Sequence, residues 1–240
     1  NQNCGGVFYD MGSEDSTVKL NPFWMIDQKE YRVWFTGYLI RYFKMKEIAV
    51  TPNDEQEIFD ALSSLAALPR ESRTFELLRN TIQQEELRAA IKTFVEGEYS
   101  DLWTNEDDSI EDSRWVVFEM RKLMNRSEEL VAFVLGYLFK KLEYRFDGTP
   151  TLLILDEAWL FLQSPMIRDV IQDWLRTLRK KNVYVSLATQ QVEGMCTEMF
   201  TVISGACQTK IMLPNAQATT PSFRSLYTAI GLTEMDIEVL

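Results

Sequence analysis

Residues 151–157 read Thr-Leu-Leu-Ile-Leu-Asp-Glu. A continuous apolar run of this length is typical of a strand that is buried on both faces of a parallel sheet. The run ends on two adjacent carboxylates, Asp156 and Glu157, which places them at the carboxyl end of the predicted strand. Ligands of open α/β sheets bind at that edge, where one acid can help to hold Mg²⁺ and its neighbour can activate water. Taken alone, the stretch is equally compatible with an ordinary strand that ends in a polar turn.

A second predicted strand, residues 183–187, also ends in polar groups, Thr189 and Gln190. A Gln at a neighbouring strand end can hydrogen-bond a γ-phosphate or the attacking water, and its amide does so without titrating. Two strand ends that carry Asp-Glu and Thr-Gln, separated by one helix, are a more specific signal than either alone.

The helix between these strands is predicted over 165–181, with Ser164 as N-cap and a proline at the first helical position. It ends in Arg179-Lys-Lys-Asn182. These cations can compensate the carboxyl end of the helix, with Asn182 near the cap. Arg179 has a second interpretation, as an arginine finger that reaches a phosphate in a neighbouring subunit.

Predicted strands and helices also alternate in the rest of the chain. Further strands are predicted at 6–10, 115–118 and 210–213, and further helices at 29–42, 128–145 and 196–204. Several helical pieces are predicted over 52–98, beginning with Thr51 as N-cap and Pro52. Strands that alternate with helices indicate an α/β fold with a parallel sheet.

The chain contains no histidine in 240 residues. This excludes Ser-His-Asp and Cys-His catalysis, His-ligated zinc and haem, and any imidazole acid–base step. Any chemistry must therefore use carboxylates, amides, hydroxyls, lysines and arginines. The length corresponds to about one and a half domains.

The charge is strongly acidic, since 25 Lys and Arg against 36 Asp and Glu give −11. Such a surface repels DNA phosphates and anionic lipid, although Arg176, Arg179, Lys180 and Lys181 form one compact basic cluster. Three cysteines without a Cys-x-x-Cys pair indicate reduced thiols. No apolar run reaches ~18 residues, so no transmembrane helix is expected.

An acidic loop is predicted at 105–113. It is interpreted as a solvated linker rather than a cation site, because the spacing of a Gly-containing calcium loop is absent.

The phosphate-binding motif G-x-x-x-x-G-K-[ST] is also absent from these residues. The composition thus offers the acids, Gln and Arg of phosphoryl transfer without the phosphate cradle.

The ordered motifs resemble the TrbE-like ATPases of conjugation and type IV secretion. The resemblance rests on 150–162, 174–183 and 188–190, supported by residues 8–12, 20–23, 118–120, 209–215 and 231–232. It implies a RecA-like P-loop NTPase core with a parallel sheet, interrupted by an inserted helical subdomain. The expected domains are core at 1–47, helical insertion at 48–112, and core again at 113–240 with the Walker B and sensor strands.

The same resemblance assigns roles. Asp156 is expected in the Mg²⁺ shell, Glu157 in water activation, Gln190 in γ-phosphate sensing beside Thr189, and Arg179 as the trans-acting arginine, with Arg176 one turn earlier as a substitute. ATP and Mg²⁺ are the implied cofactors. The Walker A element is expected before residue 1, so this chain is expected to be an internal fragment that is inactive by itself.

The family further implies a hexamer that works with other type IV secretion proteins at the cytoplasmic face of the bacterial inner membrane and powers pilus assembly and substrate transfer. Two alternatives stay open. One is a non-hydrolysing docking scaffold, which the aromatic-rich segment 23–43 would suit, although its helical spacing favours a core role. The other is a DNA-translocating ATPase, against which the acidic charge argues.

Overall fold

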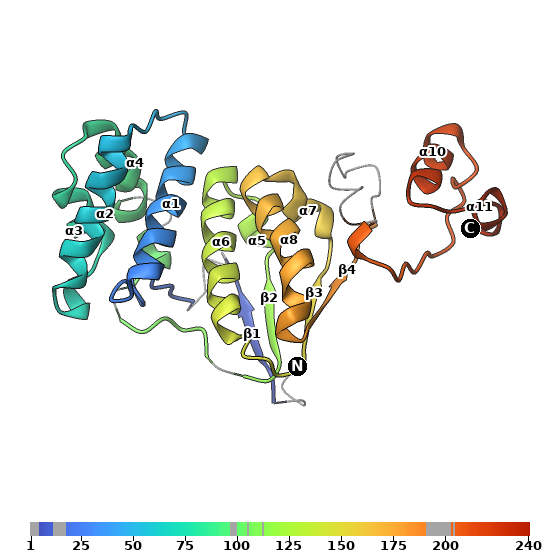
Figure 1. The fold of residues 1–240 in the computed structure, drawn as a ribbon, viewed down its shortest axis with the longest axis horizontal. Helices are drawn as coiled ribbons and strands as arrows, with labels where there is room; N and C mark the ends of the chain where they lie inside the picture. Colours follow the sequence, from blue (N-terminus) through green and yellow to red (C-terminus); the bar gives the residue numbers. More distant parts are fainter. Residues whose placement is uncertain are drawn as a thin grey trace. The chain divides into compact units, whose positions relative to one another are not determined.

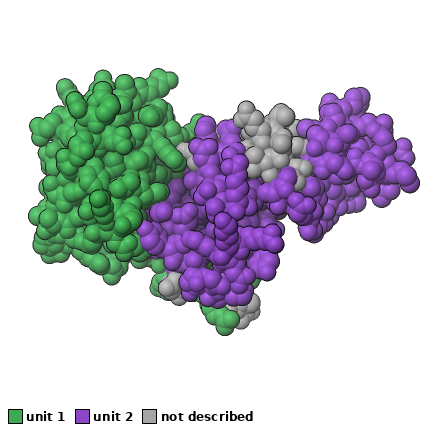
Figure 2. Space-filling model, in the orientation of Figure 1, with its two compact units in different colours: residues 1–133 green, residues 134–240 purple. Residues whose placement is uncertain are grey.

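The computed structural model describes residues 5–11, 18–96, 100–104, 106–111, 113–190, 203 and 205–240. It contains two compact units, residues 1–133 and 134–240, which Figure 2 colours separately.

A pair of parallel strands opens the first unit. β1 (Val7–Asp10) pairs in register with β2 (Val116–Glu119), so that Val7 lies opposite Val116 and Asp10 opposite Glu119. Both strands lie within one residue of their predicted positions. The pair joins segments that are more than a hundred residues apart, and four α-helices of this unit occupy the chain between them (Figure 1), while α5 (Arg121–Met124) follows β2.

The four helices between the strands are α1 (Lys29–Met45), α2 (Pro52–Ala66), α3 (Phe75–Thr81) and α4 (Glu85–Val95). α2 starts where predicted, because the Thr51 side chain accepts from Asp54 N and the Asp54 carboxylate accepts from Thr51 N, a reciprocal capping box. Thr74 and Gln84 cap α3 and α4 without the reciprocal bond, since each side chain accepts a hydrogen bond from the backbone N–H three residues on. The several helical pieces predicted from 52 onward are confirmed.

Aromatic rings fill the interior of the helical part. Phe133 is fully buried, and its ring centroid lies 4.5 Å from Phe94, 4.8 Å from Tyr38 and 5.3 Å from Tyr42. Phe75 and Trp103 complete this cluster. The helical spacing of the aromatics in α1 therefore marks a core, as predicted, and not an exposed docking stripe.

The acidic loop is held to the protein by its middle residues. Ser109 exchanges hydrogen bonds with the Lys19 backbone, and Ile110 is buried. The Asn21 side chain donates to the Glu106 carbonyl at 2.7 Å. Residues 105 and 112 lie outside the described part, but the described residues form an anchored segment and not only a solvated linker.

The second unit contains the strand quoted at the outset. β3 (Thr151–Leu155) pairs in parallel with β4 (Val183–Leu187), with Leu153 opposite Val185. Between them lie α7 (Ala158–Gln163), α8 (Pro165–Thr177) and a 3-10 turn, η4 (Leu178–Lys181). α6 (Glu128–Arg145) precedes them and begins in the first unit. Its Phe139 ring lies 4.6 Å from that of Trp174 in α8.

The expectation that β3 is buried on both faces is wrong for this chain. Leu155 is buried, but Leu152 and Ile154 are 62% and 55% exposed, and Tyr184 on β4 is 66% exposed. Successive strand residues point to opposite faces, and helix packing covers the face of Leu155 only. The other face of the β3–β4 pair carries no cover from the described residues.

The strand predicted at 210–213 is also absent, because residues 207–215 have no regular structure and Ile211 is 84% exposed. A strand needs a neighbour to pair its backbone groups, and no described strand pairs with this segment. The helix predicted at 196–204 falls mainly outside the described residues.

Two helices near the end of the chain were not predicted. α10 (Pro221–Ala229) and α11 (Glu234–Val239) pack around buried Tyr227 and Ile237. Thr233 and Asp236 form a capping box at α11, a signal that the sequence did contain. Across the described residues, no helix is both long and apolar enough to cross a membrane.

Candidate functional site

Two polar strand ends meet at one edge of the β3–β4 pair. Asp156 and Glu157 follow β3 directly, and Thr189 and Gln190 follow β4 after one residue, Ala188. Because the strands are parallel and in register, both ends reach the same edge. The structure thus brings together four of the residues that the sequence singled out.

Backbone hydrogen bonds of Ala188 connect the ends of β3 and β4. Its N–H donates to the Leu155 carbonyl at 2.9 Å, and its carbonyl accepts from Ala158 N at 2.8 Å. These two backbone bonds bracket Asp156 and Glu157 on either side. The position of the acids is therefore fixed by the neighbouring strand, a role for Ala188 that the local pattern of residues did not indicate.

Glu157 has a left-handed backbone, with φ 49° and ψ 45°. This conformation costs a residue with a side chain about 1–2 kcal/mol, and such residues cluster at functional sites when the surrounding structure holds them in place. The Asp156 side chain helps to hold it, since Oδ1 accepts from Glu157 N at 3.0 Å. The turn directs the chain from β3 straight into α7.

The Glu157 carboxylate has a specific partner. Trp159 Nε1 donates to Oε2 of Glu157 at 2.9 Å. Asp156 is exposed and Glu157 half-buried, so both acids remain accessible from solvent. Trp159 had no predicted role, although a tryptophan two residues after the acid pair was a visible signal.

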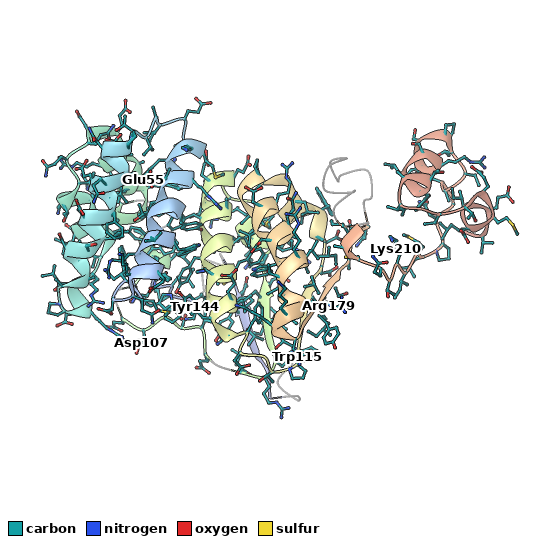
Figure 3. All side chains as sticks on the ribbon, viewed as in Figure 1. Glu55, Asp107, Trp115, Tyr144, Arg179 and Lys210 are labelled. Carbon is teal, nitrogen blue, oxygen red and sulfur yellow. The ribbon has the colours of Figure 1, made fainter. Side chains whose placement is uncertain are left out.

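Arg179 does not join this group. It lies in η4, just before β4 begins at Val183, and so at the opposite end of that strand from Gln190. Figure 3 labels it there, on the surface of the turn. Arg176, in the last turn of α8, is also exposed. Neither arginine is brought to the acids of its own chain.

At this turn Asn182 forms the cap, and Lys181 contacts a carbonyl near the end of a different helix, α6. Asn182 caps η4 in a left-handed conformation, and its side chain donates to the Gly148 carbonyl at 3.1 Å. Lys181 Nζ lies 3.5 Å from the Glu143 carbonyl. Ser164 occupies the N-cap position of α8, but its side chain accepts no capping hydrogen bond.

The donor set suits a magnesium ion that is shared with a phosphate. Over the part of the chain that the structure describes, no three His, Cys, Asp or Glu side chains are grouped to hold a metal by themselves. Mg²⁺ commonly keeps several waters and is bound through one or two carboxylates together with substrate phosphates. An exposed Asp156 beside Glu157 fits this mode of binding.

Comparison with known families now identifies the class of protein. The TraG P-loop domain family matches residues 79–240, which include both strand ends. The chain belongs to this family. Its core is accordingly that of a P-loop nucleotide-binding protein, with the Asp-Glu pair at the end of a parallel strand.

Curated relatives narrow the class to conjugation and secretion proteins. The chain is 30% identical over 99% of its length to a probable conjugal transfer protein TrbE of Sinorhizobium fredii. It is 36% identical over 82% of its length to conjugal transfer protein TrbE of Rhizobium radiobacter, and 24% identical over 87% to type IV secretion system protein VirB4 of Bartonella quintana. It spans only 36%, 24% and 27% of these three proteins. The resemblance to TrbE-like proteins is confirmed.

A solved structure confirms the fold. VirB4 of Thermoanaerobacter pseudethanolicus superposes on the whole of this chain, and on 71% of its own, with a TM-score of 0.73 at 20% sequence identity. The predicted α/β, RecA-like P-loop fold is therefore correct.

Proposed function

We propose that the protein to which this chain belongs hydrolyses ATP and so powers type IV secretion or conjugative transfer. The observation that carries the proposal is the joining of the Asp156-Glu157 and Thr189-Gln190 strand ends through Ala188. The names of the curated relatives support the biological setting, since they are conjugal transfer and type IV secretion proteins.

Each residue at the edge has a proposed task. Asp156 would hold Mg²⁺ through water, and a bound Mg²⁺ would supply the charge that neutralises the phosphates of ATP. Glu157 orients the attacking water and accepts its proton. Gln190 hydrogen-bonds the γ-phosphate or that water, with Thr189 beside it at the nucleotide. An amide and two carboxylates suffice for these tasks, which agrees with the absence of histidine.

The proposal includes an oligomer. Arg179 lies at the far end of β4 from the acids of its own chain, so it can serve only the nucleotide of a neighbouring subunit as an arginine finger. Arg176 is the substitute if Arg179 proves dispensable. We propose a hexamer that associates with other secretion proteins at the cytoplasmic face of the inner membrane. The division into core, insertion at 48–112 and core is proposed with it.

The test is the ATPase activity of the full-length gene product, measured as phosphate release. Glu157→Gln keeps the size of the side chain but removes the base, and turnover should fall by at least ~10²-fold. Asp169→Asn, at an exposed acid of α8, is the matched control and should keep wild-type turnover.

Equal rates for the wild type and Glu157→Gln would exclude Glu157 as the base. If the full-length product neither binds nor hydrolyses ATP, the docking scaffold is the better description. The 240-residue chain by itself has no phosphate-binding motif, and we expect its turnover to match that of its own Glu157→Gln variant.

A further inference from the structure

Trp159 contacts the side chain that the proposed mechanism depends on most. It lies in the first turn of α7, two residues after Glu157, and its indole Nε1 donates to Oε2 of the Glu157 carboxylate at 2.9 Å. The indole N–H is only a donor, and a hydrogen bond to an ionised acceptor is about twice as strong as one between neutral groups.

We infer that Trp159 is a positioning residue for Glu157. It holds one carboxylate oxygen and leaves the other, Oε1, to accept the proton of the attacking water. The inference rests on the proposed role of Glu157 as the base, and it adds a residue to which neither the fold nor the family assignment gives a task.

The bond matters because the rest of the turn fixes only the backbone. Ala188 and the Asp156 side chain hold the main chain at Glu157. Three rotatable bonds still separate its Cα from the carboxylate. A base must be within hydrogen-bond reach of the proton it accepts, and small misplacements cost about 10²-fold in rate. The Trp159 bond restrains those three torsions.

The chain contains a matched control for this pair. Trp174 in α8 donates from Nε1 to Oε1 of Glu143 in α6, also at 2.9 Å. The chemistry of this bond is the same, but Trp174 is buried in the helix packing and Glu143 also pairs with Lys140 at 2.9 Å. We therefore expect this bond to contribute to stability and not to turnover.

The experiment compares four forms of the full-length gene product with Mg·ATP as the probe: wild type, Glu157→Gln, Trp159→Phe and Trp174→Phe. The turnover number and KM for ATP are measured for each, together with the unfolding temperature. Phe keeps an aromatic ring and removes the donor. We expect Trp159→Phe to lower kcat about tenfold, the lower end of the ~10–100-fold loss that follows removal of a hydrogen bond orienting a metal-site ligand, and to leave KM unchanged. Trp174→Phe should lower the unfolding temperature and leave kcat unchanged.

The experiment distinguishes failure of the Trp159 inference from failure of the proposed function. If Glu157→Gln loses activity while Trp159→Phe keeps the wild-type kcat, the inference is wrong and the proposed function stands. If Trp159→Phe instead lowers kcat, raises KM and lowers the unfolding temperature together, Trp159 is merely structural. If Glu157→Gln retains full turnover, the proposed base and the inference fail together.

A second variant covers the case in which Trp159→Phe does not fold. Incorporation of β-(3-benzothienyl)alanine at position 159 keeps a bicyclic ring of nearly the same shape and replaces only the N–H by sulfur. The same loss of kcat at unchanged KM would support the inference, and a wild-type kcat would overturn it.

Discussion

Arg73 is a buried cation that joins the loop before α1 to the turn between α2 and α3. Its guanidinium makes a bidentate pair with the Asp27 carboxylate, both bonds at 2.9 Å, and donates to the Leu68 and Ala66 carbonyls at 3.0 Å. The Arg73 side chain is 8% exposed and that of Asp27 is 50% exposed. The planar guanidinium donates to three partners at once, the Asp27 carboxylate and the two carbonyls. The single ammonium group of a lysine cannot reproduce this geometry.

This pair gives stability a defined pH dependence. The hydrogen bond from Arg73 lowers the pKa of Asp27 below its usual value of 3.8. Because the pKa is lower in the folded state, the unfolded chain binds the proton more tightly. The contribution of the Asp27–Arg73 pair to the free energy of unfolding is therefore complete above pH ~4 and is lost as the pH falls through the folded-state pKa. Asp27→Asn should cost about 1 kcal/mol at pH 7, because solvent screens the half-exposed carboxylate.

The measurement is urea unfolding of the wild type and Asp27→Asn at several pH values. The difference in free energy of unfolding should narrow below pH ~4. A difference that stays constant down to pH 2 would show that the carboxylate charge contributes nothing.

Replacing Gly6 or Gly37 by alanine should change the stability of the protein in opposite directions. A Cβ at Gly6 would lie 2.7 Å from Trp115 Cδ1 and 3.0 Å from the Trp115 carbonyl, beside the start of β1. Gly6→Ala should therefore destabilise the protein by about 1–3 kcal/mol. Gly37, inside α1, has no atom within 4 Å of such a Cβ, so Gly37→Ala should stabilise by about 0.5–1 kcal/mol. Opposite shifts of the unfolding temperature check the pair, and equal shifts would contradict it.

Among the strands, β3 offers the clearest test of packing, because its two faces differ. Leu155 is 6% exposed and Leu152 is 62% exposed in the same strand. Leu155→Ala should cost this chain about 2–5 kcal/mol through lost burial and a residual cavity. Leu152→Ala should change stability by no more than about 0.5 kcal/mol. Denaturant unfolding of both variants is the measurement, and similar losses would mean that the open face is covered in solution.

Among the helices, α2 depends on its first turn. The Thr51 hydroxyl accepts from Asp54 N at 3.3 Å, and the Asp54 carboxylate accepts from Thr51 N at 2.8 Å. Thr51→Ala should destabilise the protein by about 1 kcal/mol. Thr81→Ala is the control, because Thr81 ends α3 and its hydroxyl only donates back to the Leu77 carbonyl. A Thr51→Ala variant no less stable than this control would argue against the capping box.

For the whole chain, the net charge of −11 predicts weak binding to nucleic acid. Nonspecific DNA binding depends on phosphate neutralisation by Lys and Arg, and the only compact basic cluster in the sequence is that of Arg176, Arg179, Lys180 and Lys181. We expect no binding of duplex DNA at about 0.1 M salt, measured by fluorescence anisotropy.

The control is the double variant Arg176→Gln with Arg179→Gln, which should behave like the wild type. Salt-dependent binding by the wild type that disappears in the double variant would contradict the prediction and would support a DNA-translocating function.

Local sequence determined most of the elements of this protein. Helical spacing located α1 and α6, and apolar runs located β3 and β4. The Thr51 cap and Pro52 set the start of α2, and Pro165 marks the start of α8, where the Ser164 side chain makes no capping bond. Each of these signals acts over a few neighbouring residues. The polar residues that follow β3 and β4 likewise identified Asp156, Glu157, Thr189 and Gln190 from the sequence alone.

Only the tertiary structure decided how those pieces meet. It placed Ala188 between the two strand ends. It gave Glu157 its left-handed turn and its bond to Trp159, and it left 210–213 without a partner strand among the described residues. Each of these depends on which distant segment supplies a hydrogen-bond partner or a covering surface. The residues next to a segment do not indicate which distant segment will contact it. The sequence by itself therefore did not predict these contacts.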